Sequence, residues 1–197
     1  MNKKAKKNLI EYGITGTIIL TLFLTGLHTE VFGFVQRGIL KTGLMDPDVE
    51  AKAPTTDNSK KIKADFNMSL INSKGELVEM EELRGKVIFF NIWATWCPPC
   101  VAEMPGINNL YNDTKAEDVA FIMLSVDNDF QKAIDYNKSK GYDFEVYKLA
   151  GSLPCLYASQ AIPTTYIIDA EGNLALTHKG MGDYDSEEFK GFLNNLK

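Results

Sequence analysis

An apolar segment of strand length, residues 86–93, leads directly into two cysteines that are separated by two prolines. The segment reads Lys-Val-Ile-Phe-Phe-Asn-Ile-Trp, and an apolar run of this kind is typical of a central strand buried on both faces of a sheet. Cys97 and Cys100 follow where the pattern changes to that of a helix. We therefore expect both thiols on the first turn of a helix, directly after a buried strand.

The rest of the globular part predicts further strands and helices. We expect strands over 64–70, 119–126, 165–168 and 174–178, a turn at 72–75 that leads into 76–80, and helices from the cysteines to 114, over 130–140 and over 186–196. This order predicts an α/β fold with a mixed central sheet and helices on both of its faces.

Charge is divided unevenly along the 197 residues. Residues 1–44 carry a net charge of +4, and the remainder carries −9. A domain at −9 is a poor candidate for binding a nucleic-acid backbone. A charged fraction of 24% excludes a disordered chain and a multi-span membrane protein, and three cysteines are too few for a disulfide scaffold.

The N-terminus has the pattern of an export signal, with a basic cluster in residues 1–7 followed by sixteen uncharged residues, 12–27. A cleaved signal peptide also needs small residues at its cleavage site, and no A-x-A-like site is present. An uncleaved anchor needs about 20 apolar residues, and the apolar character continues through Val31–Val35. We predict the anchor over the cleaved signal and over a buried soluble helix. The lysines then place the N-terminus in the cytoplasm and everything after the span outside.

These patterns divide the chain into three predicted parts. Residues 1–44 form the basic N-terminus, the transmembrane anchor and an interfacial segment, with His28 and Glu30 in the lipid headgroup zone. Residues 45–63 form a polar, proline-containing linker. Residues 64–197 form the globular domain.

The spacing of Cys97 and Cys100 predicts redox chemistry. Two cysteines three positions apart on one helical turn can close a disulfide with little movement of the backbone. The helix N-terminus stabilises a thiolate, so Cys97, at the very end, is expected to be the exposed nucleophile and Cys100 the buried resolving thiol. Pro98 and Pro99 suit the first helical turn, where a missing N–H costs little, and they stiffen the segment between the sulfurs.

Two other uses of the cysteine pair are less favoured. A zinc site would need a second pair of ligands, and only Cys155, His28 and His178 are available, each far from the others in sequence. A purely structural disulfide across two residues would constrain the unfolded chain very little. We therefore expect redox-active thiols and no metal.

Several motifs together resemble the thioredoxin superfamily, and in particular its membrane-anchored TlpA/ResA-like branch of bacterial thiol-disulfide oxidoreductases. The matching stretches are Ala64–Phe66, Leu83–Val87, Asn91–Trp96, Cys97–Cys100, Cys100–Pro105 and Ile162–Asp169. The resemblance covers about residues 62–197. It implies a thioredoxin-like fold behind a transmembrane anchor, and an enzyme that exchanges thiols and disulfides.

The resemblance also assigns residues that bind the substrate. Pro163 matches the cis-proline that faces the disulfide and pairs with the extended backbone of a client protein. The residues assigned to substrate binding are Trp96, Pro98, Pro99, Ile162, Pro163 and Thr164.

Glu103 completes the catalytic residues that the resemblance implies, beside Cys97 and Cys100. It lies three positions after Cys100, on the same helix face, where a glutamate of the ResA-like branch raises the thiol pKa values or relays protons. The alternative for Glu103 is a solvated helix residue. Asn91 stands where thioredoxin has a buried aspartate that accepts a proton, and an amide leaves that work to Glu103 or to water.

Three further features complete the comparison with the family. Pro105 matches the proline that kinks the active-site helix, and the stretch 137–156 resembles the central insertion of the TlpA-like branch. The resemblance assigns no role to Cys155. We expect it to be a half-buried thiol that packs on the helix before Pro163, with a second redox or regulatory cysteine as the alternative.

The function implied by the resemblance is reduction of disulfides in extracytoplasmic client proteins, apocytochrome c among the candidates. The Cys97–Cys100 pair would be the redox centre without any other cofactor, and a membrane thiol transporter of the CcdA/DsbD type would supply electrons. The implied location is the bacterial cytoplasmic membrane, with a single span and the catalytic domain on the periplasmic side. Client proteins and the membrane, and no nucleic acid, are the expected partners.

Of three alternative functions, two differ from this one in the residues that they require. A peroxiredoxin needs a Thr three residues before its reactive cysteine, where this chain has Ala94. A Sco-like copper-binding module needs cysteines three residues apart and a distant His, whereas here two residues separate the cysteines and His178 is the one His of the domain. A general oxidant or isomerase would differ in redox poise and not in architecture.

Overall fold

A computed structural model describes residues 3–24, 61–114 and 118–197, together with the isolated positions Gly33, Gln36, Gly38 and Pro47. Most of the predicted interfacial segment and nearly all of the predicted linker lie outside these residues, so the domain boundaries stay predictions. Helix α1 (Lys3–Leu24) occupies the first described range. Among the helices described, none has both the length and the apolar character needed to cross a membrane.

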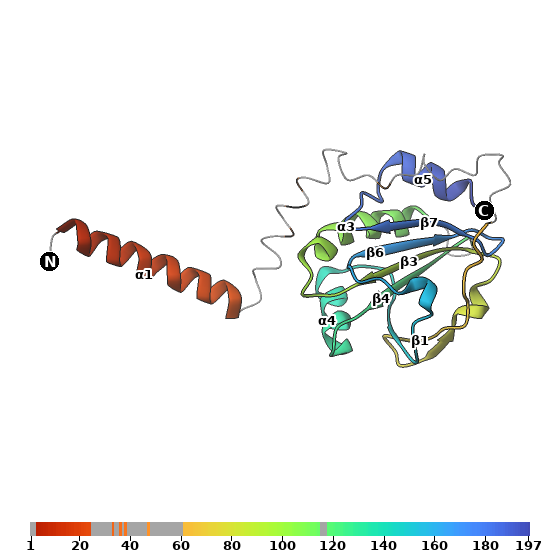
Figure 1. Cartoon of the computed structure of the whole chain (residues 1–197), viewed down its shortest axis with the longest axis horizontal. Coiled ribbons are helices and arrows are strands. Elements are labelled where there is room, and N and C mark those ends of the chain that lie inside the picture. The colour runs from red at the N-terminus through yellow and green to blue at the C-terminus, as the bar shows by residue number, and fades with distance from the viewer. Residues whose placement is uncertain are drawn as a thin grey trace.

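The centre of the domain is a seven-stranded sheet with the order β2-β1-β5-β4-β3-β6-β7 (Figure 1). Strand β3 pairs in parallel with β4, and β4 with β5, while the remaining neighbours are antiparallel. The sheet is therefore mixed, as predicted. Its strands are β1 (Ser69–Asn72), β2 (Leu77–Glu79), β3 (Val87–Trp93), β4 (Val119–Ser125), β5 (Val146–Leu149), β6 (Thr164–Ile168) and β7 (Leu174–Lys179).

Strand β3 confirms the prediction of a central strand buried on both faces of the sheet, because all seven of its residues are buried. Its side chains alternate between two hydrophobic clusters. Phe89 packs with residues of α3 (Pro98–Asp113), α4 (Phe130–Lys140) and α5 (Glu187–Asn194) on one face of the sheet. Phe90 packs on the opposite face.

That opposite face is covered by short 3-10 helices and irregular chain. Met80, in η2 (Met80–Leu83), and Tyr157, in η3 (Cys155–Tyr157), belong to the same cluster as Phe90. The sheet is thus flanked by helices, but the three predicted α-helices all lie on the first face and, among the residues described, the second carries only 3-10 turns, so the expectation of these helices on both faces was wrong.

Two predictions about strands need correction. The first strand was placed over 64–70, but β1 begins at Ser69. Phe66 and Met68 are buried without belonging to a strand, so their apolar alternation reflects packing onto the core and not pairing in the sheet. Strand β5 was missed, because its four residues lie inside the stretch that had been interpreted as an insertion.

Helix α4 matches its predicted range at both ends, and its capping residues explain why. The Asp129 side chain accepts a hydrogen bond from the Gln131 N–H at the N-terminus. Gly141 has a φ of +66° at the C-terminus, a backbone conformation that favours glycine.

Candidate active site

The reactive cysteines lie where the chain leaves β3 and enters α3. Cys97 is the N-cap of α3, and Pro98 occupies the first helical position. The Cys100 backbone N–H points at Cys97 and donates a hydrogen bond to its Sγ atom, over 3.3 Å. This contact puts a backbone donor of the first helical turn on the predicted nucleophile, where it stabilises a thiolate.

Cys97 and Cys100 form a disulfide with their Cα atoms 5.3 Å apart. Cys97 keeps 4% of its surface exposed and Cys100 none. The predicted order of exposure is therefore confirmed, although both residues are largely covered in the disulfide form.

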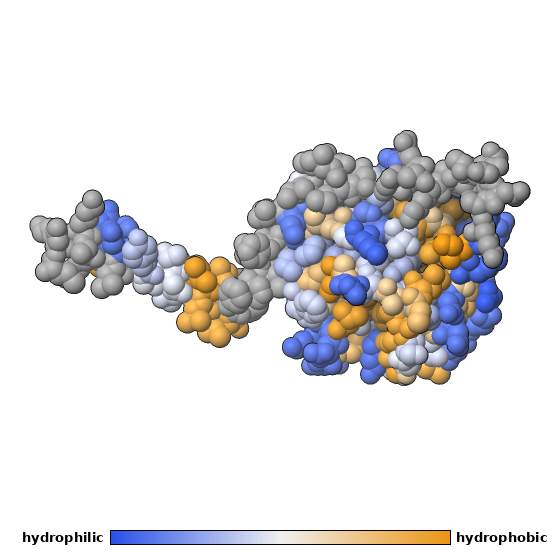
Figure 2. Space-filling view, in the orientation of Figure 1, coloured by the Kyte–Doolittle hydropathy of each residue, from blue (hydrophilic) through white to orange (hydrophobic). Residues whose placement is uncertain are grey.

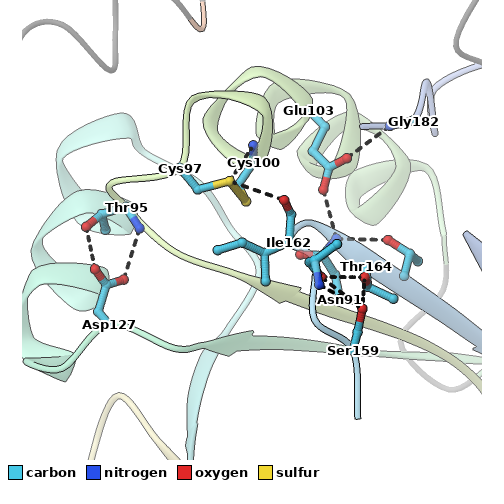
Figure 3. The surroundings of a disulfide bond; sticks show 12 residues. Asn91, Thr95, Cys97, Cys100, Glu103, Asp127, Ser159, Ile162, Thr164 and Gly182 are labelled. Atoms are coloured by element: carbon cyan, nitrogen blue, oxygen red, sulfur yellow. Dashed lines mark hydrogen bonds between the residues drawn. A yellow bond between two sulfur atoms is a disulfide. The ribbon is translucent and has the colours of Figure 1, made fainter. Parts of the chain in front are cut away.

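The peptide bond between Ile162 and Pro163 is cis, as the resemblance implied. The Ile162 carbonyl oxygen lies 3.8 Å from Cys97 Sγ (Figure 3). Residues about sixty-five positions apart thus meet at the sulfur that a client would approach. Pro163 itself is buried.

Thr164, which was assigned to substrate binding, has its side chain inside the protein. Its hydroxyl donates a hydrogen bond to the Ala161 carbonyl and lies 2.9 Å from the Ser159 hydroxyl. Since the residue is fully buried, the side chain orders the turn before the cis-proline. A contact between Thr164 and a client would therefore involve the Thr164 backbone.

The remaining residues assigned to substrate binding form the rim of the site. Trp96 is 57% exposed, directly before Cys97. Pro98, Pro99 and Ile162 are half-buried. A large exposed aromatic side chain beside a reactive sulfur is suited to contact with a protein client.

Glu103 lies one helical turn beyond Cys100 and is only 1% exposed. Its Oε1 atom accepts a hydrogen bond of 2.8 Å from the Asn91 side-chain amide, and its Oε2 atom accepts one of 3.0 Å from the Gly182 N–H (Figure 3). Burial raises the pKa of Glu103 to about 8, against the lowering effect of these two donors. The alternative of a solvated helix residue is therefore wrong, and near neutral pH this carboxyl can hold or release a proton.

The Asn91 amide also donates a hydrogen bond of 2.9 Å to the Thr165 hydroxyl oxygen. The same oxygen accepts a bond of 2.7 Å from the Tyr184 hydroxyl, and burial raises the pKa of Tyr184 well above its usual range. The sequence analysis missed both residues. No sequence pattern pointed to Thr165, because its contact with Asn91 depends on the register between β3 and β6.

Asp127 was also missed. It follows β4, and its carboxylate accepts hydrogen bonds from both the backbone N–H and the hydroxyl of Thr95, two residues before Cys97. No motif pointed to it, because the contact depends on two parallel strands ending side by side.

Cys155 differs from its prediction. Its side chain is exposed at the start of η3, not half-buried. The 3-10 turn buries Tyr157 completely, and that orientation leaves the thiol on the surface. Within the described ranges, no three His, Cys, Asp or Glu side chains group together as a metal site.

Comparison with known proteins agrees with this geometry. The Redoxin family model matches residues 49–193. The thiol-disulfide oxidoreductase ResA of Bacillus cereus is 30% identical over 135 residues, which cover 66% of this chain and 75% of ResA. The ResA of Oceanobacillus iheyensis is 31% identical over 135 residues, covering 67% and 69% of the two chains.

Solved structures show the same fold. A putative thiol:disulfide interchange protein DsbE from Chlorobium tepidum aligns with a TM-score of 0.61 and 26% identity, over 71% of this chain and 99% of the other. StoA from Bacillus subtilis aligns with a TM-score of 0.54 and 23% identity, over 68% and 98%. At that lower identity the likeness to StoA concerns the fold alone.

Proposed function

Because this chain belongs to the redoxin family and is a thiol-disulfide oxidoreductase of the TlpA/ResA-like kind, we propose that it works as a reductase of client disulfides outside the cytoplasm. The observation that carries the proposal is the pair of sulfurs at the start of α3, with a backbone donor on Cys97 and a buried carboxyl one turn beyond Cys100.

The proposed reaction begins with the Cys97 thiolate. It attacks one sulfur of a client disulfide, the client S–S bond breaks, and a mixed disulfide forms as one client thiolate leaves. The Cys100 thiolate then attacks Cys97 Sγ, the second client thiolate leaves, and the Cys97–Cys100 disulfide closes. Two electrons pass from the dithiol to the client, and the two protons that the dithiol gives up are balanced by those that the client thiolates take up.

Glu103 favours the reducing direction. Above its pKa of about 8 Glu103 is ionised, and its negative charge one turn from Cys100 then disfavours a thiolate there. Destabilising the reduced form makes a dithiol the better electron donor. Since burial raises the pKa of Glu103 to about 8, the group can also take up or release a proton as the disulfide opens and closes. We propose both effects as its catalytic role.

A membrane dithiol donor of the CcdA/DsbD type is the proposed source of electrons. The pair itself carries the two electrons of each cycle, so the proposed reaction involves no other cofactor. A donor is required because each turnover leaves the protein oxidised and unable to reduce a second client.

We further propose that the N-terminal segment anchors the enzyme in the bacterial cytoplasmic membrane, with the catalytic domain on the periplasmic side. The basic residues at the start of the chain favour this orientation. Figure 2 shows that α1 changes from hydrophilic near its N-terminus to hydrophobic toward Leu24, where Ile18, Ile19, Leu20 and Leu24 are all more than half exposed. A fusion of alkaline phosphatase to the C-terminus should be active in intact cells, and activity of a cytoplasmic reporter at that position would contradict the orientation.

Cytochrome c maturation is the client process that we propose, and trapping tests it. A Cys100→Ser variant that also carries Cys155→Ser cannot resolve its mixed disulfide, so clients should stay bound to Cys97. The matched control carries Cys97→Ser and Cys155→Ser. Apocytochrome c among the proteins released by reductant, and absent from the control, is the expected result. Trapped proteins without any apocytochrome would exclude this client.

A further inference from the structure

We propose that Asp127 is a positioning residue for thiol-disulfide exchange, which orients the turn carrying Cys97 by holding Thr95. Asp127 does not touch the reacting sulfurs in this proposal. The proposal depends on the exchange activity and not on the direction in which electrons flow.

One carboxylate joins the turn before Cys97 to the end of β4. The Thr95 N–H donates to Asp127 Oδ2 over 3.0 Å, and the Thr95 hydroxyl donates to Oδ1 over 2.6 Å (Figure 3). The Ser125 hydroxyl donates to Oδ2 over 2.8 Å, and the Asp127 N–H donates back to the Ser125 oxygen over 3.1 Å. Both carboxylate oxygens therefore bind the same residue, which fixes the orientation of Thr95 as well as its position.

These bonds begin where the sheet stops holding the chain. Trp93 and Ser125 are the last paired residues of β3 and β4, and the Val126 N–H donates to the Trp93 carbonyl over 2.9 Å. The chain then leaves the sheet for four residues before α3 begins at Pro98. Within that turn the Cys97 N–H donates to the Ala94 carbonyl over 3.3 Å. Asp127 supplies side-chain bonds in place of the strand pairing that has ended.

The position of this turn matters because disulfide exchange needs the attacking sulfur close to its target and in line with the bond that breaks. Displacing a reacting group by about 1 Å can cost on the order of a hundredfold in rate. Ile162 approaches Cys97 Sγ from the cis-proline side, whereas Asp127 acts through Thr95. Hydrogen bonds to a charged acceptor are about twice as strong as neutral ones, so this contact can hold the turn while the disulfide opens and closes.

The chain offers a matched control two residues away. Asp129 is exposed and caps α4 by accepting a hydrogen bond from the Gln131 N–H over 3.1 Å. An Asp129→Asn variant loses the same charge in the same region, without a hydrogen bond to the turn. It separates positioning from the loss of a negative charge near the site.

The test uses the full-length protein with Cys155→Ser in every variant. The second-order rate of attack of the reduced protein on oxidised glutathione is measured across pH. Asp127→Asn, which cannot accept from all three donors, should slow the limiting rate by about tenfold to a hundredfold at unchanged inflection pH. Asp129→Asn should stay within about twofold, because losing charge alone does not slow attack on this anionic disulfide.

Substitutions of Thr95 form a second set of variants, for which we expect smaller losses of rate. Thr95→Val removes the hydroxyl donor and should slow the reaction less than Asp127→Asn. Thr95→Ser keeps both donors and should restore the rate. The double variant with Asp127→Asn and Thr95→Val should be no slower than Asp127→Asn alone, because both changes break one contact.

Three results would overturn the proposal. The first is a rate for Asp127→Asn within twofold of the parent protein, and the second is an equal loss in Asp129→Asn. The third is a shifted inflection with an unchanged limiting rate, which would assign Asp127 an electrostatic effect on the thiol. If Asp127→Asn does not fold, the Thr95 pair decides: equal rates for Thr95→Val and Thr95→Ser contradict the proposal. None of these rates depends on the client or on the electron donor. A failure of the Asp127 proposal can therefore be distinguished from a failure of the proposed reductase function.

Discussion

Cys97 and Cys100 share one disulfide, but their surroundings differ. Cys97 faces the rim of the site, with the exposed Trp96 before it and the Ile162 carbonyl 3.8 Å from its sulfur. Cys100 is completely buried, on the helix that carries Glu103 one turn further on. In the proposed mechanism, one end of the disulfide meets the client, and the other end lies near the carboxyl that holds or releases a proton.

This difference explains how a small site can divide an exchange reaction. In the proposed reaction the sulfur of Cys97 must accept and release a client, whereas that of Cys100 must wait until the mixed disulfide has formed. The polar groups behind Cys100, Glu103 and Asn91 with Thr165 and Tyr184, are all buried and bonded to one another or to backbone. Single substitutions can therefore test the two ends of the disulfide separately.

Replacing the cysteines singly should produce the largest effect. Cys97→Ser should reduce turnover by on the order of a thousandfold or more, because the nucleophile is lost. Cys100→Ser should also stop turnover while still forming the mixed disulfide. Insulin reduction with dithiothreitol as donor measures turnover, and mass spectrometry detects the adduct. An adduct that forms equally well on Cys97→Ser would contradict the assignment of the two ends.

Glu103→Gln should change how stability depends on pH. The folded pKa of about 8 lies above the ordinary 4.5, so the native protein binds more protons than the unfolded chain between these values. The free energy of unfolding therefore falls as pH rises through that window, by on the order of 5 kcal/mol at most. Urea denaturation of the oxidised protein from pH 5 to pH 9 should show this fall in the parent and lose it in Glu103→Gln. Glu188→Gln, at an exposed position of α5, should keep the fall.

Tyr184→Phe should have a smaller effect at the same buried end. It removes the donor to Thr165 and should lower the free energy of unfolding by about 1–2 kcal/mol. Tyr166→Phe is the matched control, since the Tyr166 hydroxyl donates to the Tyr157 carbonyl in the other hydrophobic cluster. Both variants should lose stability, and only Tyr184→Phe should move the inflection of the pH–rate profile. Identical pH–rate profiles for the two variants would show that Tyr184 contributes to stability and does not influence the reaction.

Trp96→Ala tests the accessible end. It should lower kcat/KM for a protein substrate by about tenfold, or about 1.4 kcal/mol. Attack on oxidised glutathione should change by no more than about twofold. The control is Leu77→Ala, which shortens an exposed apolar side chain on the edge strand β2. Equal losses on the protein and the small substrate would assign Trp96 to the chemistry instead of client contact.

Cys155→Ser should have the smallest effect. The thiol is exposed, so stability should change by less than about 0.5 kcal/mol. Insulin reduction should keep its rate. A clear loss of turnover would revive the alternative that Cys155 is a second redox cysteine.

The sequence predicted those parts of the fold whose signals are local. The apolar run of β3, the proline-containing start of α3 and the Asp129 and Gly141 caps of α4 each identify an element from neighbouring residues. Strand β5 and the start of β1 were not recovered, because a short or half-buried strand depends on the partner beside which it lies.

The residues of the site also divide into those that local signals predicted and those that were missed. The two cysteines lie three positions apart in sequence, and the family motif carried Glu103 and Pro163. The exposed Cys155 was predicted wrongly, because a 3-10 turn is too short to show a periodic pattern. The contacts of Thr165 with Asn91, of Asp127 with Thr95 and of Tyr184 with Thr165 span 74, 32 and 19 positions of the chain. The folded sheet and its connections create these contacts, and no local sequence pattern indicates them.

The redox state of the Cys97–Cys100 pair in growing cells tests the central claim most directly. Cells that express the full-length Cys155→Ser protein are quenched in acid, free thiols are alkylated with a heavy maleimide, and the two states are separated on a gel. A reductase supplied by a membrane donor should be mostly reduced, and should become oxidised when the donor is removed. A pair that is mostly oxidised in normal cells would contradict the reducing role and would indicate an oxidant.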